Sequence, residues 1–241
     1  MPPKDTANVC SHFRRWGLPA AARSALAWRL RNWFGLHLNG IYTRPLIPPG
    51  IGLNVEGKGY AYRVFEPGDE HALLGFLDNS ELQLEEAFVR NAFAKGDACA
   101  GVFLDGRLIS YSWMAFTPTR DTQGVYVEFG PKYRYGYKAF TLPQFRGRHV
   151  MRLFKAYGDD YCVRRGRELA IAFIATDNFS SIRASLGAGS QRIGFAGYWK
   201  LGPLFISFRT VQVRAAGFRF FKPWTGQVKG ALQPKPIDAR S

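Results

Sequence analysis

Apolar and polar positions along this 241-residue chain follow two different periods, which predict a mixture of strands and helices. Tyr60, Tyr62 and Val64 alternate with other residues, as in a half-buried strand. Residues 169–176 form a continuous apolar run of strand length, typical of a strand covered on both faces. Apolar residues at helical spacing predict helices from Ser80 to Gly96 and over 150–166.

Turn signals divide these elements. Asp105-Gly106 lies between two apolar runs and predicts a hairpin of antiparallel strands. The aromatic segment 125–143, bent at Gly130-Pro131, predicts one or two strands, and residues 191–215 predict two more. A strand before helix 150–166 and a buried strand after it make a crossover whose two strands are parallel. The sequence therefore predicts an α/β fold, an α+β mixed sheet flanked by helices.

The two ends of the chain differ from this central pattern. Residues 18–35 predict a basic amphipathic helix, which either packs on the main domain or docks on a membrane surface. Residues 44–52 contain three prolines and two glycines and predict a linker. The expected organisation is an N-terminal extension over 1–50, a main domain over 51–215, and a basic aromatic to proline-rich tail over 216–241, disordered in its last dozen or so residues.

Composition narrows the class of partner. Lys and Arg number 33 against 18 acidic residues, a net charge of +15, which favours polyanions such as lipid head groups, nucleotide cofactors or nucleic acid. Nucleic acid is the less favoured partner, because the charge is dispersed and no recognition motif appears. The spacing of the three cysteines and four histidines indicates neither a metal site nor a disulfide framework. Without a membrane-spanning run or a signal peptide, a cytoplasmic location is expected.

The stretch 133–154, YRYGYKAFTLPQFRGRHVMRLF, is the candidate for chemistry. It runs from an aromatic strand through a Thr-Leu-Pro break to Arg146-Gly147-Arg148, directly before a helix. The first turn of a helix has unpaired backbone N–H groups and the positive end of the helix dipole, which together bind phosphate. A pyrophosphate is one interpretation; a plain basic loop between a strand and a helix is the other.

Two segments resemble the GNAT superfamily of acyl-CoA-dependent N-acyltransferases, over roughly residues 59–213. FTLPQFRGRHVMRLF is similar to the family's strand, Pro-bearing turn, pyrophosphate loop and helix. IATDNFSSIRASLGAGS resembles its buried strand followed by an Asn-x-x-Ser helix. The resemblance implies a GNAT-type N-acyltransferase (EC 2.3.1) that uses acetyl-CoA or another acyl-CoA as co-substrate and no metal.

The resemblance also implies a cofactor site. The backbone of Ala139, Phe140 and Thr141 would pair with the pantetheine arm. Asn178 and Ser181 would lie beside the pantetheine and thiol end. Backbone amides of the loop and first helical turn would hold the diphosphate; these residues are Arg146, Gly147, Arg148, His149, Val150 and Met151. His149 and Met151 stand where the family usually has glycines, so the backbone there approaches a phosphate less freely.

The resemblance also gives candidates for the catalytic groups. Ser185 occupies the position at which the family often has a tyrosine that protonates the departing thiolate. Tyr198, on the next predicted strand, is the candidate to replace that tyrosine as the acid. Glu128 precedes the cofactor loop, as the family's base often does. The alternative for Glu128 is an exposed strand residue paired with Lys132 or a nearby Arg. Cys162 lies in a helix pattern and is expected to be structural.

Three functions fit these observations. The first is acyl transfer to a primary amine of a small molecule, an amino sugar or a glycan. The second is a basic GNAT-like module that has lost catalysis and binds an anionic membrane surface or nucleic acid. The third joins them, with an acyltransferase held peripherally on the inner face of the membrane by helix 18–35, acting on an intermediate of envelope or surface-glycan synthesis.

Overall fold

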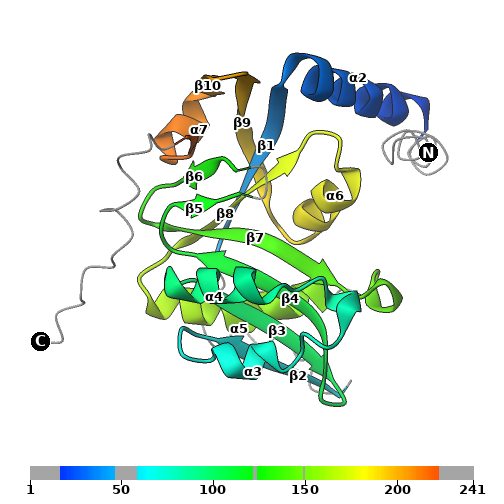
Figure 1. Ribbon diagram of the computed structural model, residues 1–241, viewed down its shortest axis with the longest axis vertical. Helices are drawn as coiled ribbons and strands as arrows, with labels where there is room; N and C mark the ends of the chain where they lie inside the picture. Colours follow the sequence, from blue (N-terminus) through cyan, green and yellow to red (C-terminus); the bar gives the residue numbers. More distant parts are fainter. Residues whose placement is uncertain (1–16, 47–58, 122–123, 149, 223–241) are drawn as a thin grey trace, which may run out of the picture. The chain divides into compact units, whose positions relative to one another are not determined.

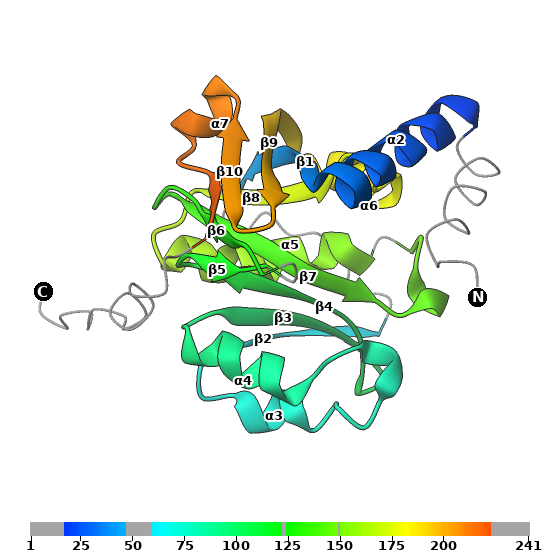
Figure 2. The same cartoon turned by 45° about the horizontal axis from the view of Figure 1, so that its top comes forward.

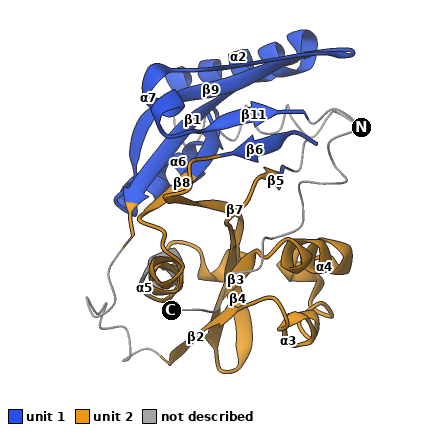
Figure 3. Cartoon of the chain, turned by 90° about the vertical axis from the view of Figure 1, so that its left-hand side faces the viewer, with its two compact units in different colours: residues 1–44, 120–128, 172–222 blue, residues 45–119, 129–171, 223–241 orange. Residues whose placement is uncertain are grey.

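The computed structural model describes residues 17–46, 59–121, 124–148 and 150–222. The chain divides into two compact units, each discontinuous in sequence (Figure 3). Unit 1 comprises residues 1–44, 120–128 and 172–222; unit 2 comprises residues 45–119, 129–171 and 223–241. Strand β8 (Leu169–Ala175) begins in unit 2 and ends in unit 1.

Unit 2 is a mixed sheet flanked by helices, as predicted. Strands β2, β3, β4 and β7 pair antiparallel in that order, and β7 pairs parallel with the first residues of β8. Helix α5 covers one face of the sheet and helices α3 and α4 cover the other (Figure 3). The bounds are β2 Tyr60–Phe65, α3 Glu70–Leu74, α4 Glu86–Ala94, β3 Ala98–Leu104, β4 Arg107–Ala115, β7 Tyr133–Thr141 and α5 Val150–Arg164. The parallel β7–α5–β8 step confirms the predicted crossover unit.

Local signals explain why these elements begin and end where they do. Asp105 and Gly106 have φ angles of 51° and 75°, the left-handed values that a type I′ hairpin turn requires. The sheet then buries large side chains between its two helical layers, among them Phe65, Phe93 and Trp113. Cys162 on α5 belongs to this core, with its Sγ 3.6 Å from Met114 Sδ, which agrees with a structural role.

The predicted helix from Ser80 to Gly96 is wrong in its first part. A 3₁₀ turn over Ser80–Leu82 is followed by Gln83 with φ 53°, and α4 begins only at Glu86. The break has a packing reason, because Leu82 is buried and its carbonyl accepts a hydrogen bond from Tyr111 Oη at 2.9 Å. A continuous helix would use that carbonyl for its own backbone ladder.

Unit 1 contains the end of β8 followed in strand order by β1, β9 and β10. A small sheet places β6 between β11 and β5; Arg120 of β5 belongs to unit 1 and Thr119 to unit 2. Helix α2 precedes β1 at the N-terminal side, and α7 packs against β9 (Figures 1 and 2). The bounds are α2 Leu18–Phe34, β1 Leu36–Pro45, β5 Thr119–Arg120, β6 Tyr126–Glu128, α6 Phe179–Gly187, β9 Gln191–Leu201, β10 Leu204–Arg209, α7 Val211–Ala215 and β11 Arg219–Phe221.

Strand β1 was not predicted from the sequence. Only a helix and a proline-rich linker were expected before residue 51, whereas β1 pairs antiparallel with β9 from Leu36 to Thr43. The predicted linker over 44–52 overlaps the end of β1 at Arg44 and Pro45, and residues 47–52 lie outside the described residues. The boundaries after residues 50 and 215 stay a prediction; the compact units are built from segments on both sides of them.

The C-terminal part of unit 1 also differs from expectation. Residues 211–215, predicted as strand, form helix α7, and Arg219–Phe221 form strand β11 paired with β6. Phe218 and Phe220 are buried, and the Phe220 ring packs at 5.2 Å from that of Tyr198. The predicted disorder of the last dozen residues concerns positions outside the described ones. Among the helices that are described, none is long and apolar enough to cross a membrane.

Candidate active site

Strand β7 has one open edge. It pairs with β4 as far as Thr141, but its parallel pairing with β8 covers only Tyr133, Arg134 and Tyr135. Among residues 136–141, the backbone groups that point away from β4 have no strand partner, although the Thr141 carbonyl accepts from Arg146 Nε and the Phe140 carbonyl accepts from Ser110 Oγ. A strand edge of this kind is a template for another extended chain.

A β-bulge lies in the middle of this open edge. Tyr111 pairs with Phe140 while Trp113 pairs with Tyr137, so β7 holds one extra residue between them. Lys138 has a φ of 41°, a left-handed value that costs free energy for any residue but glycine. Bulges of this kind bend the strand and redirect its side chains, often beside functional sites. Here the Lys138 Nζ lies 3.8 Å from the centroid of the Phe88 ring, and burial lowers the Lys138 pKa.

The edge leads directly into the basic loop. Pro143–Phe145 form a 3₁₀ turn, and Gly147 has a φ of 79°. Arg146 Nε donates to the Thr141 carbonyl at 3.1 Å, and both Arg146 and Arg148 are exposed. Within the described part of the chain, neither guanidinium pairs with a carboxylate. Two positive charges without a carboxylate partner thus lie just before α5.

Unit 2 brings together most of the predicted cofactor residues. Ala139, Phe140 and Thr141 lie on the open edge, as the family resemblance implies. Arg146, Gly147 and Arg148 form the loop, and the buried Val150 and then Met151 begin α5. His149 and the side chain of Met151 lie outside the described residues. Their contact with acyl-CoA stays a prediction.

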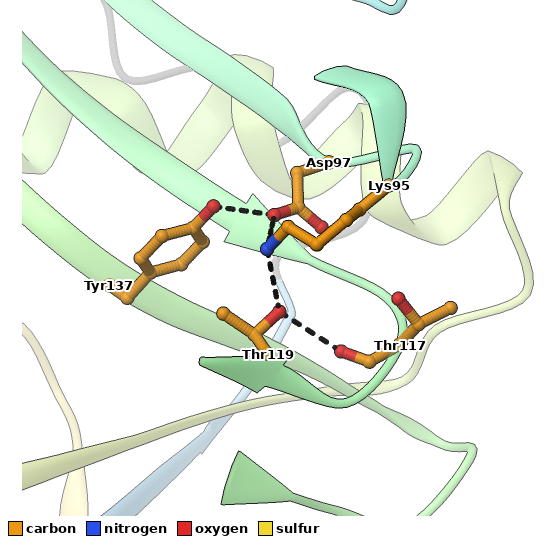
Figure 4. A network of polar contacts seen from close by, with 5 residues as sticks. All are labelled: Lys95, Asp97, Thr117, Thr119 and Tyr137. Carbon is orange, nitrogen blue, oxygen red and sulfur yellow. Dashed lines mark hydrogen bonds and ion pairs between the residues drawn. The ribbon is translucent and has the colours of Figure 1, made fainter. Parts of the chain in front are cut away.

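A polar network lies behind the bulge and was missed from sequence (Figure 4). Tyr137 Oη donates to Asp97 Oδ2 at 2.5 Å, and Lys95 Nζ lies 2.8 Å from the same oxygen. Lys95 also donates to Thr119 Oγ1 at 3.3 Å. The Asp97 side chain is 0% exposed, and its second oxygen has no hydrogen-bond partner among the described residues. The sequence signal is weak because Asp97 lies 40 positions before Tyr137.

The network has a definite protonation preference. Burial raises the pKa of Asp97, while Lys95 and Tyr137 act in the opposite direction. Burial and the neighbouring Asp97 raise the pKa of Tyr137, so its phenol is protonated at neutral pH. Tyr137 is thus a proton donor held by a buried carboxylate, one residue before the bulge.

Asn178 and Ser181, the other predicted cofactor residues, belong to unit 1. Asn178 Oδ1 accepts from Ser181 N at 3.1 Å and from Ser180 Oγ at 3.0 Å, so Asn178 caps helix α6. This structural use of the oxygen leaves the amide nitrogen of Asn178 for any further contact.

Glu128, the predicted base, lies on β6 in unit 1. It forms an ion pair with Arg219 of the neighbouring strand β11. Lys132, the other candidate partner, pairs with Glu168 instead at 3.3 Å. This geometry fits the alternative of a strand residue paired with a nearby Arg. The catalytic role of Glu128 stays a prediction.

Tyr198, the predicted acid, lies on β9 and is only 2% exposed. Its ring stacks on that of His37, with centroids 4.4 Å apart. Burial is the main cause that raises the pKa of Tyr198. The phenol is therefore protonated, as an acid must be, but it lies inside unit 1.

Metal ligation has no support among the described residues, where no three His, Cys, Asp or Glu side chains gather. What the site offers instead is a strand edge, a basic loop and a protonated phenol.

Comparison with known proteins gives only structural likenesses. No protein-family model and no curated protein matches the chain. A tandem GNAT protein from the clavulanic acid biosynthesis pathway matches with a TM-score of 0.47 and 18% identity over 80% of this chain and 59% of its own. An aminoglycoside acetyltransferase from an uncultured soil metagenomic sample, in complex with trehalose, has a TM-score of 0.42 and 6% identity over 55% of this chain and 88% of its own. A ribosomal-protein-alanine N-acetyltransferase from Brucella melitensis has a TM-score of 0.37 and 10% identity over 52% of this chain and 86% of its own.

All three likenesses have TM-scores below 0.5. This chain spans 59% of the length of the tandem protein. Identity is 18% or lower in all three, so these neighbours identify neither a substrate nor a mechanism for this chain.

Proposed function

We propose that this protein is an acyl-CoA-dependent N-acyltransferase, which transfers an acetyl or longer acyl group to a primary amine. The observation that carries the proposal is the open edge of β7, bulged at Lys138, which leads directly into the basic loop Arg146–Arg148 and helix α5. All of these features belong to unit 2.

The edge and the loop suit two different parts of one ligand. The pantetheine arm contains amide groups that pair with backbone N–H and C=O groups like those of residues 136–141. The diphosphate is anionic and suits the N-terminus of α5 with Arg146 and Arg148 beside it. Bound in this way, acyl-CoA supplies an activated thioester. The protein's contribution is to align that thioester with the amine.

The reaction also requires two proton movements. The attacking amine loses a proton, and the departing thiolate gains one. We assign Glu128 as the base and Tyr198 as the acid, following the sequence prediction. Tyr137 is a poor alternative for the acid, because its hydroxyl hydrogen is donated to Asp97 and its raised pKa makes it a weaker proton donor.

For the acceptor, we propose an amine on an amino sugar or on an envelope or surface-glycan intermediate. Aromatic rings gather along β7, where Tyr135 and Tyr137 stack with centroids 5.7 Å apart, and Phe129 lies 5.7 Å from Tyr135. Aromatic faces pack well against apolar surfaces such as the C–H face of a sugar, which supports this choice.

Isothermal titration of the full chain with acetyl-CoA and longer acyl-CoAs tests the proposal. The double variant Arg146→Gln/Arg148→Gln is expected to bind at least about tenfold more weakly, because each charge-assisted contact contributes about 1.5–3 kcal/mol. Arg90→Gln/Arg107→Gln removes the same charge from exposed positions of unit 2 that pair with glutamates, and it serves as the matched control. Failure of the unmodified protein to bind any acyl-CoA would rule out the proposal.

An exposed apolar face in unit 1 favours docking on an anionic membrane. The same docking is expected if the chain is a GNAT-like membrane module that has lost catalysis. One face of β9 and β10 carries exposed apolar residues in register, with Leu204 opposite Leu201 and Ile206 opposite Trp199. Trp199 Nε1 donates to the Phe34 carbonyl at 2.5 Å, which joins this face to the exposed end of α2. Monomeric proteins seldom expose a contiguous apolar patch of this kind without an interaction that uses it.

Catalysis distinguishes the two functions. If the protein binds acyl-CoA and transfers the acyl group to an amine, membrane docking serves an enzyme. If it docks on anionic vesicles but binds no acyl-CoA, the chain is a GNAT-like membrane module that has lost its activity.

A further inference from the structure

Unit 1 contains a cavity of about 270 Å³ that neither the acyl-CoA site nor the membrane face uses. Helix α2 provides one wall through Arg23, Leu26, Leu30 and Arg31. Strand β1 and the end of β8 provide the other walls. All residues that line the cavity belong to unit 1.

The walls leave apolar surface uncovered. Leu26 is 57% exposed and Leu38 is 38% exposed, although both line the cavity. Phe195 adds an aromatic ring on β9. Covering these side chains with an apolar group is favourable, because it removes their surface from water.

The charged groups at the cavity do not balance. Arg31 and Asp177 form an ion pair at 2.7 Å and cancel each other. Burial, then the charges of Arg31 and Lys200, lower the pKa of His37, so the imidazole is neutral at neutral pH. Arg23 is exposed, and its guanidinium carbon lies 5.6 Å from the centroid of the Phe179 ring. In the described chain it has no carboxylate partner, which leaves a positive charge beside an apolar cavity. A second cation lies near the Phe195 wall, where the guanidinium carbon of Arg192 is 4.7 Å from the centroid of the Phe195 ring.

We propose that this cavity binds an amphipathic anion, in which a carboxylate or phosphate contacts Arg23 and a short apolar chain lies against Leu26, Leu38 and Phe195. The neutral His37 ring offers one further N–H donor to the anionic head. The volume equals that of about nine water molecules at roughly 30 Å³ each, which suits a chain of about eight carbons. This site does not depend on the proposed acyltransferase activity.

Isothermal titration of the full chain with octanoate and with octyl phosphate, both below micelle-forming concentrations, tests the proposal. Three control probes each change one property. Acetate lacks the apolar chain, octanol has no charge, and octylamine carries a positive charge in place of the negative one. Octanoate or octyl phosphate is expected to bind, and whichever binds more tightly identifies the head group. Affinity is expected to rise by up to roughly fourfold for each methylene buried. Acetate, octanol and octylamine are expected to bind at least about tenfold more weakly.

Substitutions distinguish binding in the cavity from non-specific attraction of an anion to exposed positive charges. Arg23→Gln is expected to weaken octanoate binding about tenfold or more. Arg29→Gln removes an exposed charge from the same helix outside the cavity and is expected to leave binding unchanged, as is Arg146→Gln/Arg148→Gln in unit 2. Thermal unfolding confirms that each variant is folded. Equal binding of octanol and octanoate, or equal losses in the Arg23 and Arg29 variants, would overturn the proposal.

Discussion

Asp97 is a buried carboxylate whose two polar neighbours, Lys95 and Tyr137, share one of its oxygens (Figure 4). Asp97→Ala is expected to lower the free energy of unfolding by about 1–3 kcal/mol, because the Tyr137 hydroxyl and the Lys95 ammonium both lose their acceptor. Asp97→Asn keeps an acceptor oxygen and is expected to cost less. Urea denaturation measures both, and equal losses in the two variants would contradict the account.

The same residue gives a pH dependence with a definite sign. Burial raises the pKa of Asp97, so the folded protein binds this proton more tightly than the unfolded chain, whose carboxyl titrates near 3.9. The protonated form favours folding, and that contribution is lost as pH rises from about 4 through the raised pKa. Relative to Asp97→Asn, the wild type is therefore expected to lose stability as pH increases over this range. A difference between the two proteins that grows in the opposite direction would show that the ion pair with Lys95 dominates.

Two substitutions of Asn178 distinguish its role as the cap of helix α6 from a role in binding acyl-CoA. Asn178→Ala is expected to cost about 1 kcal/mol of folding stability, because Ser181 N loses its acceptor. Asn178→Ser retains a capping oxygen but removes the amide nitrogen. If that nitrogen contacts acyl-CoA, as the resemblance implies, the Ser variant keeps its stability and loses affinity. Unchanged affinity in the Ser variant would assign Asn178 to the cap alone.

Elements with strong local signals could be predicted from the sequence. The hairpin follows from Asp105-Gly106, and α6 follows from its Asn cap. Strand β1 could not be predicted, because its pairing partner β9 lies far along the chain and its own residues include Asn39-Gly40 and Pro45, which resemble turn residues.

One part of the candidate site could be predicted from the sequence and the rest could not. The loop Arg146-Gly147-Arg148 is contiguous in sequence and could be recognised there. The Lys95–Asp97–Tyr137 network could not, because it forms only when the start of β3 and the middle of β7 fold into one sheet. The open edge of β7 depends on where its pairing with β8 stops, which no residue pattern shows.

On the scale of the whole molecule, a net charge of +15 combines with the exposed apolar face of β9, β10 and the end of α2. Binding to vesicles that contain anionic lipid is expected, and it should weaken steeply with salt. Trp33→Glu and Ile206→Glu are expected to reduce flotation with these vesicles, since Trp33 is 66% exposed and Ile206 is 49% exposed. Val211→Glu, on α7, places the same charge at another exposed apolar position of unit 1 and is the control.

Deleting residues 1–45 is not a suitable test of docking, because the deletion would remove β1 from the sheet of unit 1. Point variants keep that strand. If all three glutamate variants float like the wild type, charge alone accounts for vesicle binding and the apolar face has another use.

Hydrogen–deuterium exchange of the full chain with and without acetyl-CoA tests the central claim most directly. The account predicts slower exchange at the backbone amides of 136–141 that face away from β4, and at the loop and first turn of α5 after Gly147. The Arg146→Gln/Arg148→Gln variant should lose both effects at the same acetyl-CoA concentration. Protection confined to other segments, or no protection at saturating acetyl-CoA, would contradict the claim that acyl-CoA binds along the edge of β7.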